Sequence, residues 1–191
     1  MTTTYLLIAI AIIVLLYTMS LYNRFVSLRN NAVKAWSNID LLLKQRHEEL
    51  PNLVAACKEY MNHENDLFTK VTALRNEAET ARQSQDVNNI SKSEGALTLA
   101  VNGLLAKAEA YPDLKSSANF QQLMGRVSTL EDSITDRREF YNESVNILNT
   151  RRDQFPAMIV ARGFGFAAKP LYEVEAGQKG SVDVGSLFNK A

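Results

Sequence analysis

The sequence predicts an all-α protein in which an N-terminal transmembrane helix continues into an antiparallel four-helix bundle. Three observations lead to this fold class. Residues 3–22 carry no charged side chain. Apolar side chains then recur at alternating spacings of three and four, which is typical of packed helices. Turn-forming residues are few, with 8 glycines and 4 prolines in 191 residues, which argues against a sandwich or barrel of short strands.

The composition excludes several classes of function. Lys and Arg number 21 and Asp and Glu number 21, so there is no basic excess for a nucleic-acid partner. The single cysteine, Cys57, forms no internal disulfide and suits a reducing compartment. His63-Glu64 begins a helical zinc motif, but Leu67 stands where the second histidine is needed. We therefore expect no metal, no cofactor and no nucleic-acid partner.

Residues 1–22 are expected to form a membrane anchor. Twenty helical residues span about 30 Å, the thickness of the hydrocarbon core of a bilayer. Tyr5, Tyr17 and Tyr22 stand near the ends of the apolar run, where aromatic rings favour the interface. No basic residue precedes the run and no small-x-small cleavage site follows it, so we expect an uncleaved anchor in contact with lipid rather than a signal peptide.

The flanking charges predict an orientation for this anchor. No Lys or Arg precedes Tyr5, whereas Arg24, Arg29 and Lys34 follow the apolar run. The positive-inside rule then places the N-terminus outside and the helical part on the cytoplasmic side. A periplasmic helical part is the alternative.

Residues 23–160 are expected to form the four helices. The first continues from the anchor without a break and carries a stripe at spacings of 3-4-3-4-3: Phe25, Leu28, Ala32, Ala35, Ile39 and Leu42. Pro51 then predicts a tight reversal near residues 46–48 and a new helix. The alternative is one continuous helix with a kink at the proline.

The second helix is predicted over residues 50–81, followed by a polar linker over 82–90. Ser91 and Glu94 resemble a capping box that opens a third helix, which Pro112 ends. Asn119 is the expected cap of a fourth helix that runs to Pro156. Residues 161–191 are expected to form a flexible C-terminal tail.

Charged residues interrupt two of the apolar stripes. Glu64 interrupts that of the second helix, and Arg137 and Arg138 interrupt that of the fourth. Because a buried charge costs several kcal/mol unless it is paired, we expect Glu64 to pair with Arg137 or Arg138. The alternative is that the stripe is open to solvent at Glu64. An alternative function follows from the same residue, namely a binding module for a small ligand or ion around Glu64.

Several longer motifs together resemble the bacterial LemA family, with coverage from about Tyr22 to Phe166. Met158 departs from the family, which often has Asn there, and the residues after Lys169 do not align with it. The matching stretches are Tyr22-Asn-Arg-Phe-Val-Ser-Leu-Arg-Asn30, Ala35-Trp-Ser-Asn-Ile-Asp40, Arg46-His-Glu-Glu-Leu-Pro-Asn-Leu-Val54, Ala108-Glu-Ala-Tyr-Pro-Asp-Leu-Lys115, Asn119-Phe120, Tyr141-Asn142, Phe155-Pro156 and Phe164-Gly-Phe166.

The resemblance implies a single-pass protein of the bacterial inner membrane with an antiparallel four-helix bundle on its cytoplasmic side. The family has no established enzymatic activity, and its members look like accessory proteins linked to envelope stress or to membrane compartments. Polar motif residues that lie off the apolar stripes are candidate contacts for a partner: Asn23, Arg29, Asn30, Asn52, Asp113 and Lys115.

We therefore expect a non-enzymatic scaffold or interaction module. Its partners would be a second copy of the chain, in a homo-oligomer, or other membrane proteins. The regular heptads and the small side chains Ala78 and Ala81 allow subunits to pack side by side. The alternative is that the four helices of one chain cover these apolar stripes among themselves. The sequence shows no constellation of nucleophile, base and oxyanion donors that would indicate an enzyme.

Overall fold

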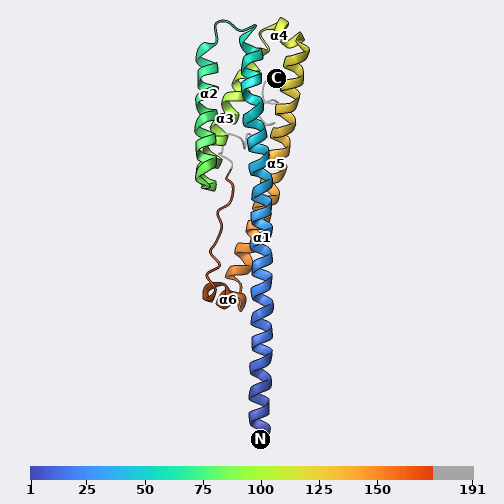
Figure 1. Cartoon of the computed structure of the whole chain (residues 1–191), viewed down its shortest axis with the longest axis vertical. Helices are drawn as coiled ribbons and strands as arrows, with labels where there is room; N and C mark the ends of the chain where they lie inside the picture. Colours follow the sequence, from blue (N-terminus) through green and yellow to red (C-terminus); the bar gives the residue numbers. More distant parts are fainter. Residues whose placement is uncertain (174–191) are drawn as a thin grey trace, which may run out of the picture. The chain divides into compact units, whose positions relative to one another are not determined.

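A computed structural model of the chain describes residues 1–173, and these residues form helices and no strand (Figure 1). The all-α fold class is therefore confirmed. The helices are α1 (Thr2–Lys58), α2 (Asn65–Ser84), α3 (Val87–Ala108), α4 (Pro112–Ser116), α5 (Ala118–Asp153) and α6 (Ala157–Gly163). The chain divides into a first unit, residues 1–41 and 133–171, and a second unit, whose described residues are 42–132 and 172–173.

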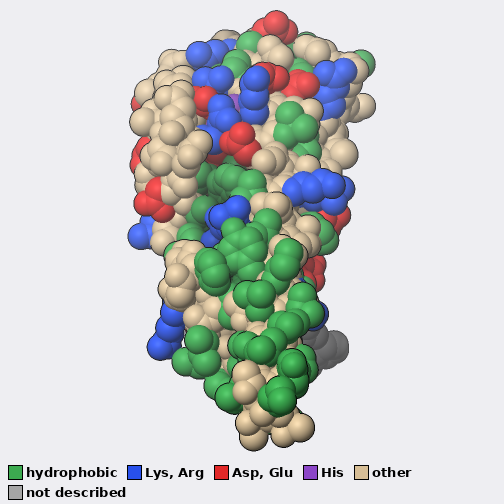
Figure 2. All heavy atoms as spheres, turned by 60° about the horizontal axis from the view of Figure 1, so that its bottom comes forward, with side chains coloured by type: hydrophobic (Ala, Val, Ile, Leu, Met, Phe, Trp, Pro, Cys, Tyr) green, Lys and Arg blue, Asp and Glu red, His purple; other side chains and the backbone are tan. Residues whose placement is uncertain are grey.

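The N-terminal part of α1 exposes its apolar side chains. Leu15, for example, is 68% exposed. Among the described residues, α1 is the one helix long and apolar enough to cross a membrane, judged by length and composition. Figure 2 shows the hydrophobic side chains gathered at the end of the molecule that carries this segment. A side-chain surface of this kind is suited to lipid rather than to water.

The first unit has a small apolar core next to the exposed apolar segment of α1. Leu21 and Phe25 of α1 pack with Leu148 of α5 and with the α6 residues Ala157, Val160 and Ala161. Further along α1, the ring centroid of Trp36 lies 5.4 Å from that of Tyr141 on α5. The stripe predicted for this part of α1 is confirmed, because Phe25, Ala32, Ala35 and Ile39 are buried and Leu28 and Leu42 are half-buried.

The chain after α6 turns back and packs along α5. Gly165 has a φ of +72°, a conformation that glycine adopts readily, and it lets the N–H of Phe166 donate to the Ala161 carbonyl at 2.9 Å. The Asn149 side chain then bonds both backbone groups of Lys169, donating to its carbonyl at 2.9 Å and accepting from its N–H at 3.0 Å.

Residues 161–171 therefore differ from the loose tail that we expected to begin at residue 161. The Phe166 ring stacks on Phe25 at 5.1 Å between ring centroids. The Tyr141 hydroxyl also donates to the Pro170 carbonyl at 3.0 Å, which holds this segment against α5. The remainder of the expected tail, residues 174–191, lies outside the described residues.

The second unit packs four helical segments around one apolar core, an arrangement compatible with the expected bundle. The segments are the end of α1, all of α2 and α3, and the beginning of α5, with the short α4 at one end (Figure 1). Leu53, Val71, Leu97, Leu104 and Val127 are among the buried members of this core.

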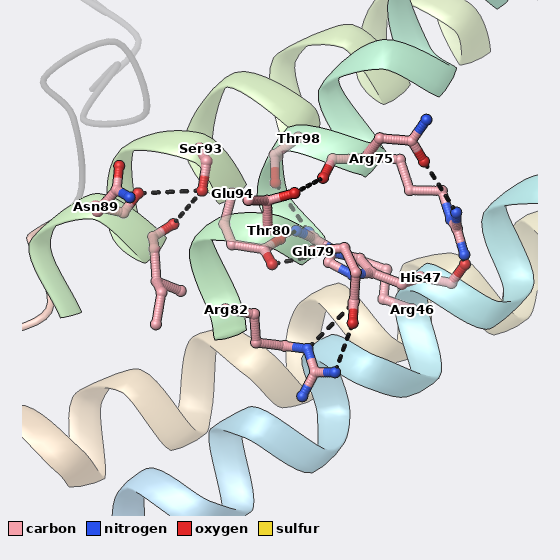
Figure 3. Close-up of polar contacts among 12 residues, drawn as sticks. Arg46, His47, Arg75, Glu79, Thr80, Arg82, Asn89, Ser93, Glu94 and Thr98 are labelled. Atoms are coloured by element: carbon pink, nitrogen blue, oxygen red, sulfur yellow. Dashed lines mark hydrogen bonds and ion pairs between the residues drawn. The ribbon is translucent and has the colours of Figure 1, made fainter. Parts of the chain in front are cut away.

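The reversal expected at Pro51 is wrong, because α1 continues through the proline to Lys58. Proline has no N–H, so the carbonyl four residues earlier, that of His47, loses its intrahelical partner. The guanidinium of Arg75 on α2 donates its Nε–H to this carbonyl at 2.8 Å (Figure 3). A side chain from a neighbouring helix thus replaces the missing backbone bond, and the helix continues.

Four other expected boundaries are also wrong. The stripe over residues 50–81 belongs to two helices, because the chain turns between Lys58 and Asn65. The linker over 82–90 is only a short turn, in which the Asp86 carboxylate accepts from the N–H of Asn88 at 3.0 Å and so caps α3. The expected capping pair Ser91 and Glu94 lies buried inside α3, and α5 begins at Ala118, before Asn119.

Candidate functional site

A buried group of charged and polar side chains lies in the second unit, and we call it the Arg46 cluster. It draws on all four helical segments of that unit, and Figure 3 shows most of its members pointing toward one another. The cluster consists of Arg46 and His47 on α1, Glu79 and Arg82 on α2, Glu94 and Thr98 on α3, and Glu131 on α5.

Arg46 occupies the centre of this cluster and is only 2% exposed. Its Nη2 pairs with the carboxylate of Glu94, which is fully buried, and its Nη1 pairs with the carboxylate of Glu131. Nη1 also donates to the Thr98 hydroxyl at 2.9 Å, and that hydroxyl donates to Glu131 at 3.2 Å. The guanidinium therefore joins α1 to α3 and α5.

His47 lies next to Arg46 and between two carboxylates. Its Nδ1 is 2.9 Å from Glu79 on α2, and its Nε2 is 3.0 Å from Glu94 on α3. The Arg82 guanidinium also contacts Glu79 and donates to both of its carboxylate oxygens, at 2.8 Å and 3.2 Å. The imidazole is as buried as the guanidinium, so neither ring nitrogen faces open water.

The surroundings of the two carboxylates hold both of them in the ionised form. The hydrogen bonds from Arg82 lower the pKa of Glu79 to about 2; partial burial opposes this shift and His47 adds to it. Burial also opposes ionisation of Glu94, but the adjacent His47 and Arg46 outweigh it and keep the pKa of this carboxyl below its ordinary value. Glu79 and Glu94 are thus carboxylates that their cationic neighbours keep ionised.

Such a closed set of charges is suited to holding helices together rather than to chemistry on a substrate. The carboxylates of Glu79, Glu94 and Glu131 are directed at cations of the same chain. Within residues 1–173, no three His, Cys, Asp or Glu side chains gather as they would around a metal ion. A buried ionic group specifies which helix faces meet, since a different pairing would leave charges buried without partners.

The structure does not bring Glu64 together with the arginines expected to pair with it. Its carboxylate lies 3.2 Å from the Lys107 ammonium and 3.2 Å from the Tyr111 hydroxyl, both in the second unit. The expectation came from a stripe running through residue 64, but that residue precedes the first turn of α2, so it lies on no helical stripe. Arg137 and Arg138 belong to the first unit, where Arg137 is exposed and Arg138 is buried.

The other candidate partner contacts are exposed, three of them in the first unit and three in the second. Lys115 lines a groove of about 530 Å³ with Phe120 and Met124. The Arg29 guanidinium lies over the Phe166 ring, 6.0 Å from its centroid. Their role in binding a partner stays a prediction for the whole set: Asn23, Arg29, Asn30, Asn52, Asp113 and Lys115.

Sequence reasoning missed the Arg46 cluster, although the spacing contains a signal for it. Arg46 lies on the stripe formed by Ile39, Leu43, Leu50 and Leu53, at alternating spacings of four and three. Glu94 likewise lies on an apolar stripe of α3, four residues after Ile90 and three residues before Leu97. The rule applied to Glu64, that a charge on an apolar stripe must be paired, would have found both residues.

The chain is similar in sequence to several known proteins. The chain is 23% identical over 168 residues to the magnetosome protein MamQ of Magnetospirillum gryphiswaldense, and to MamQ 2 of Paramagnetospirillum magneticum. Each of these matches covers 76% of this chain and 62% of the relative, so the chain spans less than two thirds of their length. Protein LemA of Metamycoplasma hominis is 26% identical over 163 residues, covering 84% of this chain and 73% of the relative.

The family model described as the LemA family matches residues 35–185. It covers most of the chain and runs past Phe166, where the motif resemblance stopped. It includes residues of the C-terminal segment that did not align by motif. The exposed apolar segment of α1 and these relatives support a membrane protein. The chain belongs to the LemA family.

Proposed function

We propose that the chain is a non-enzymatic scaffold or interaction module, anchored in the bacterial cytoplasmic membrane by α1. The observation that carries the proposal is the continuity of α1. One helix begins with exposed apolar side chains and ends, without a break, among the buried residues of the second unit. The apolar segment and a buried part of the second unit thus belong to one helix.

The chemistry of the second unit agrees with a non-catalytic role. Its most concentrated polar group, the Arg46 cluster, is occupied by its own ion pairs. Glu64, around which we considered a ligand site, is engaged by Lys107 and Tyr111 near the surface. No observation favours the ligand-binding alternative over the scaffold.

We further propose that the N-terminus lies outside and that the helical part faces the cytoplasm. Arg24 and Arg29 follow the apolar segment directly, and Arg162 of α6 adds a third exposed cation in the same unit. Fusions of alkaline phosphatase and of green fluorescent protein to the C-terminus test this orientation. The proposal predicts fluorescence without phosphatase activity, and the reverse result would place the helical part in the periplasm.

Self-association is the proposed mode of action, and α5 offers a surface for it. Phe140 and Ile147 are exposed and stand seven residues apart, so they lie on one face of the helix in the first unit. Exposed large apolar side chains on one face are typical of a contact surface. The names of the MamQ relatives associate those proteins with the magnetosome, and by analogy we extend to this chain a role in organising a membrane.

Chemical crosslinking of the full chain in native membranes tests the proposed surface. Replacing Phe140 and Ile147 together by Glu should abolish the crosslinked species, because each copy would bring buried carboxylates to the contact. Ser128→Glu, at an exposed polar position on the same helix, is the matched control and should crosslink as the wild type does. Unchanged crosslinking of the double variant would exclude this face of α5.

A further inference from the structure

We propose that α6, together with Phe155 before it and the turn to Phe166 after it, is a second membrane contact that lies in an anionic lipid interface. We call these residues, 155–166, the α6 foot. The proposal rests on α1 as the membrane span and adds a second element, which contacts the same leaflet from the side. Four observations within the first unit carry it.

The first observation is the position of the α6 foot along α1. Its buried face, formed by Ala157, Val160 and Ala161, packs against Leu21 and Phe25. These two residues stand at and just beyond the end of the uncharged segment 3–22, within about 6 Å of each other along the helix axis. The headgroup layer on each side of a bilayer is about 5–8 Å thick, so α6 lies at its level.

The second observation is the contact between aromatic rings at the same level. The Phe164 ring lies 5.0 Å from that of Tyr22, measured between centroids, and the Phe166 ring lies 5.7 Å from it. Tyr22 is the last residue of the uncharged segment. The α6 foot thus adds two aromatic rings to the tyrosine, and aromatic rings are enriched at membrane interfaces.

The third observation is the apolar surface that the α6 foot leaves uncovered. Phe155 is 78% exposed, Ile159 is 63% exposed and Phe164 is 58% exposed. Ile159 lies on the face of α6 opposite to the buried alanines. Phe164 joins this surface to the exposed apolar segment of α1 through its contact with the exposed Tyr22, and this link identifies lipid, rather than water, as the neighbour of the α6 foot.

The fourth observation is the charge around the α6 foot. Residues 21–30 of α1, some of which pack against the α6 foot, and residues 148–169, which include it, contain one acidic residue, Asp153, and it pairs with Arg152 at 2.9 Å. An excess of cations beside an apolar face at this level indicates an anionic phospholipid surface. The basic residues of the two stretches are Arg24, Arg29, Arg151, Arg152, Arg162 and Lys169.

Spin labels on the full chain in vesicles of equal parts phosphatidylcholine and phosphatidylglycerol test the proposal. Single cysteines replace Ile159 on α6, Leu15 in the span, and Ser37, an exposed residue of α1 well beyond the span. The native Cys57 is fully buried and stays unlabelled at neutral pH. The readout is the collision rate of each label with oxygen, which partitions into lipid, and with a nickel chelate, which stays in water.

The label at Ile159→Cys should collide with nickel severalfold less often than the label at Ser37→Cys, and should meet oxygen more often. A second label at Phe155→Cys should behave in the same way. In pure phosphatidylcholine vesicles, the labels of the α6 foot should become more accessible to nickel. Equal accessibility in both lipids would contradict the anionic preference.

Two other results would overturn the proposal in distinguishable ways. If the Ile159 label behaves as the Ser37 label does while the Leu15 label stays in lipid, the α6 foot lies in water and the span survives. If the Ile159 label is shielded from both oxygen and nickel, another protein surface covers it. A Leu15 label that meets nickel freely would refute the span itself, and with it the proposed function.

Discussion

Replacing Arg46 by methionine should destabilise the second unit strongly. The substitution retains most of the aliphatic volume but leaves the fully buried Glu94 without its guanidinium partner. Removing one member of a buried ion pair costs about 3–5 kcal/mol, because the other charge stays buried. The second partner, Glu131, is 29% exposed and can recover water, so the cost comes mainly from Glu94.

A double variant separates this cost from the loss of packing. In Arg46→Met with Glu94→Leu, neither of the two buried charges remains, and much of the lost free energy should return. We expect a coupling energy of at least about 2 kcal/mol between the two substitutions. Additive effects would mean that the two side chains contribute independently.

Urea unfolding of the full chain in a mild detergent, followed by circular dichroism, measures these free energies. The matched control is Lys44→Met, two residues away on α1. Lys44 stands 4.0 Å from Glu48, with the two side chains 58% and 64% exposed. Exposed pairs of this kind contribute little, so the control should change the free energy of unfolding by less than about 0.5 kcal/mol. The reasoning is refuted if Arg46→Met costs no more than Lys44→Met.

Three further predictions concern the same unit. Arg75→Met should cost about 1–3 kcal/mol because it leaves the buried His47 carbonyl without a donor. Arg75→Met should lower the free energy of unfolding clearly less in a Pro51→Ala background, because the backbone N–H of residue 51 then donates to the His47 carbonyl. An equal cost in both backgrounds would contradict our account of the proline. The free energy of unfolding should fall between about pH 5 and pH 2, because Glu79, with a pKa lowered to about 2, contributes stability that is present above its unfolded value of 4.5 and is lost as protons bind. Glu79→Gln should flatten that part of the urea-unfolding pH profile, and an unchanged profile would exclude this carboxyl. Burial raises the pKa of Cys57 to about 11, so iodoacetamide at pH 8 should modify it only after urea is added; rapid modification of the folded chain would show that the thiol is accessible.

Local patterns predicted the helical architecture well. The uncharged run before Tyr22 predicted the exposed apolar part of α1, and the three-four spacing predicted its buried residues, such as Ala32 and Ile39. These features depend on helix geometry alone, which repeats along the chain whatever the tertiary contacts are. Existence and type of the long helices could therefore be predicted.

The features that could not be predicted depend on contacts between residues that are distant in the sequence. Pro51 ends no helix because Arg75, 24 positions away in the sequence, supplies the missing donor. The segment near Lys169 is packed because Asn149 happens to present both an acceptor and a donor to it. The apparent stripe through Glu64 continued across a turn by coincidence of spacing, and a single sequence contains nothing that distinguishes this from a real stripe.

The mass of the full chain in lipid nanodiscs, measured by light scattering, tests most directly the proposal that this protein is anchored in a membrane and acts by assembling. We predict one defined oligomer in the wild type and in Ser128→Glu, and a monomer when Phe140 and Ile147 are both replaced by Glu. A monomeric wild type at all accessible concentrations would contradict self-association. The exposed polar residues of the family motifs, such as Asn52 and Asp113, would then be the positions at which to crosslink a different partner.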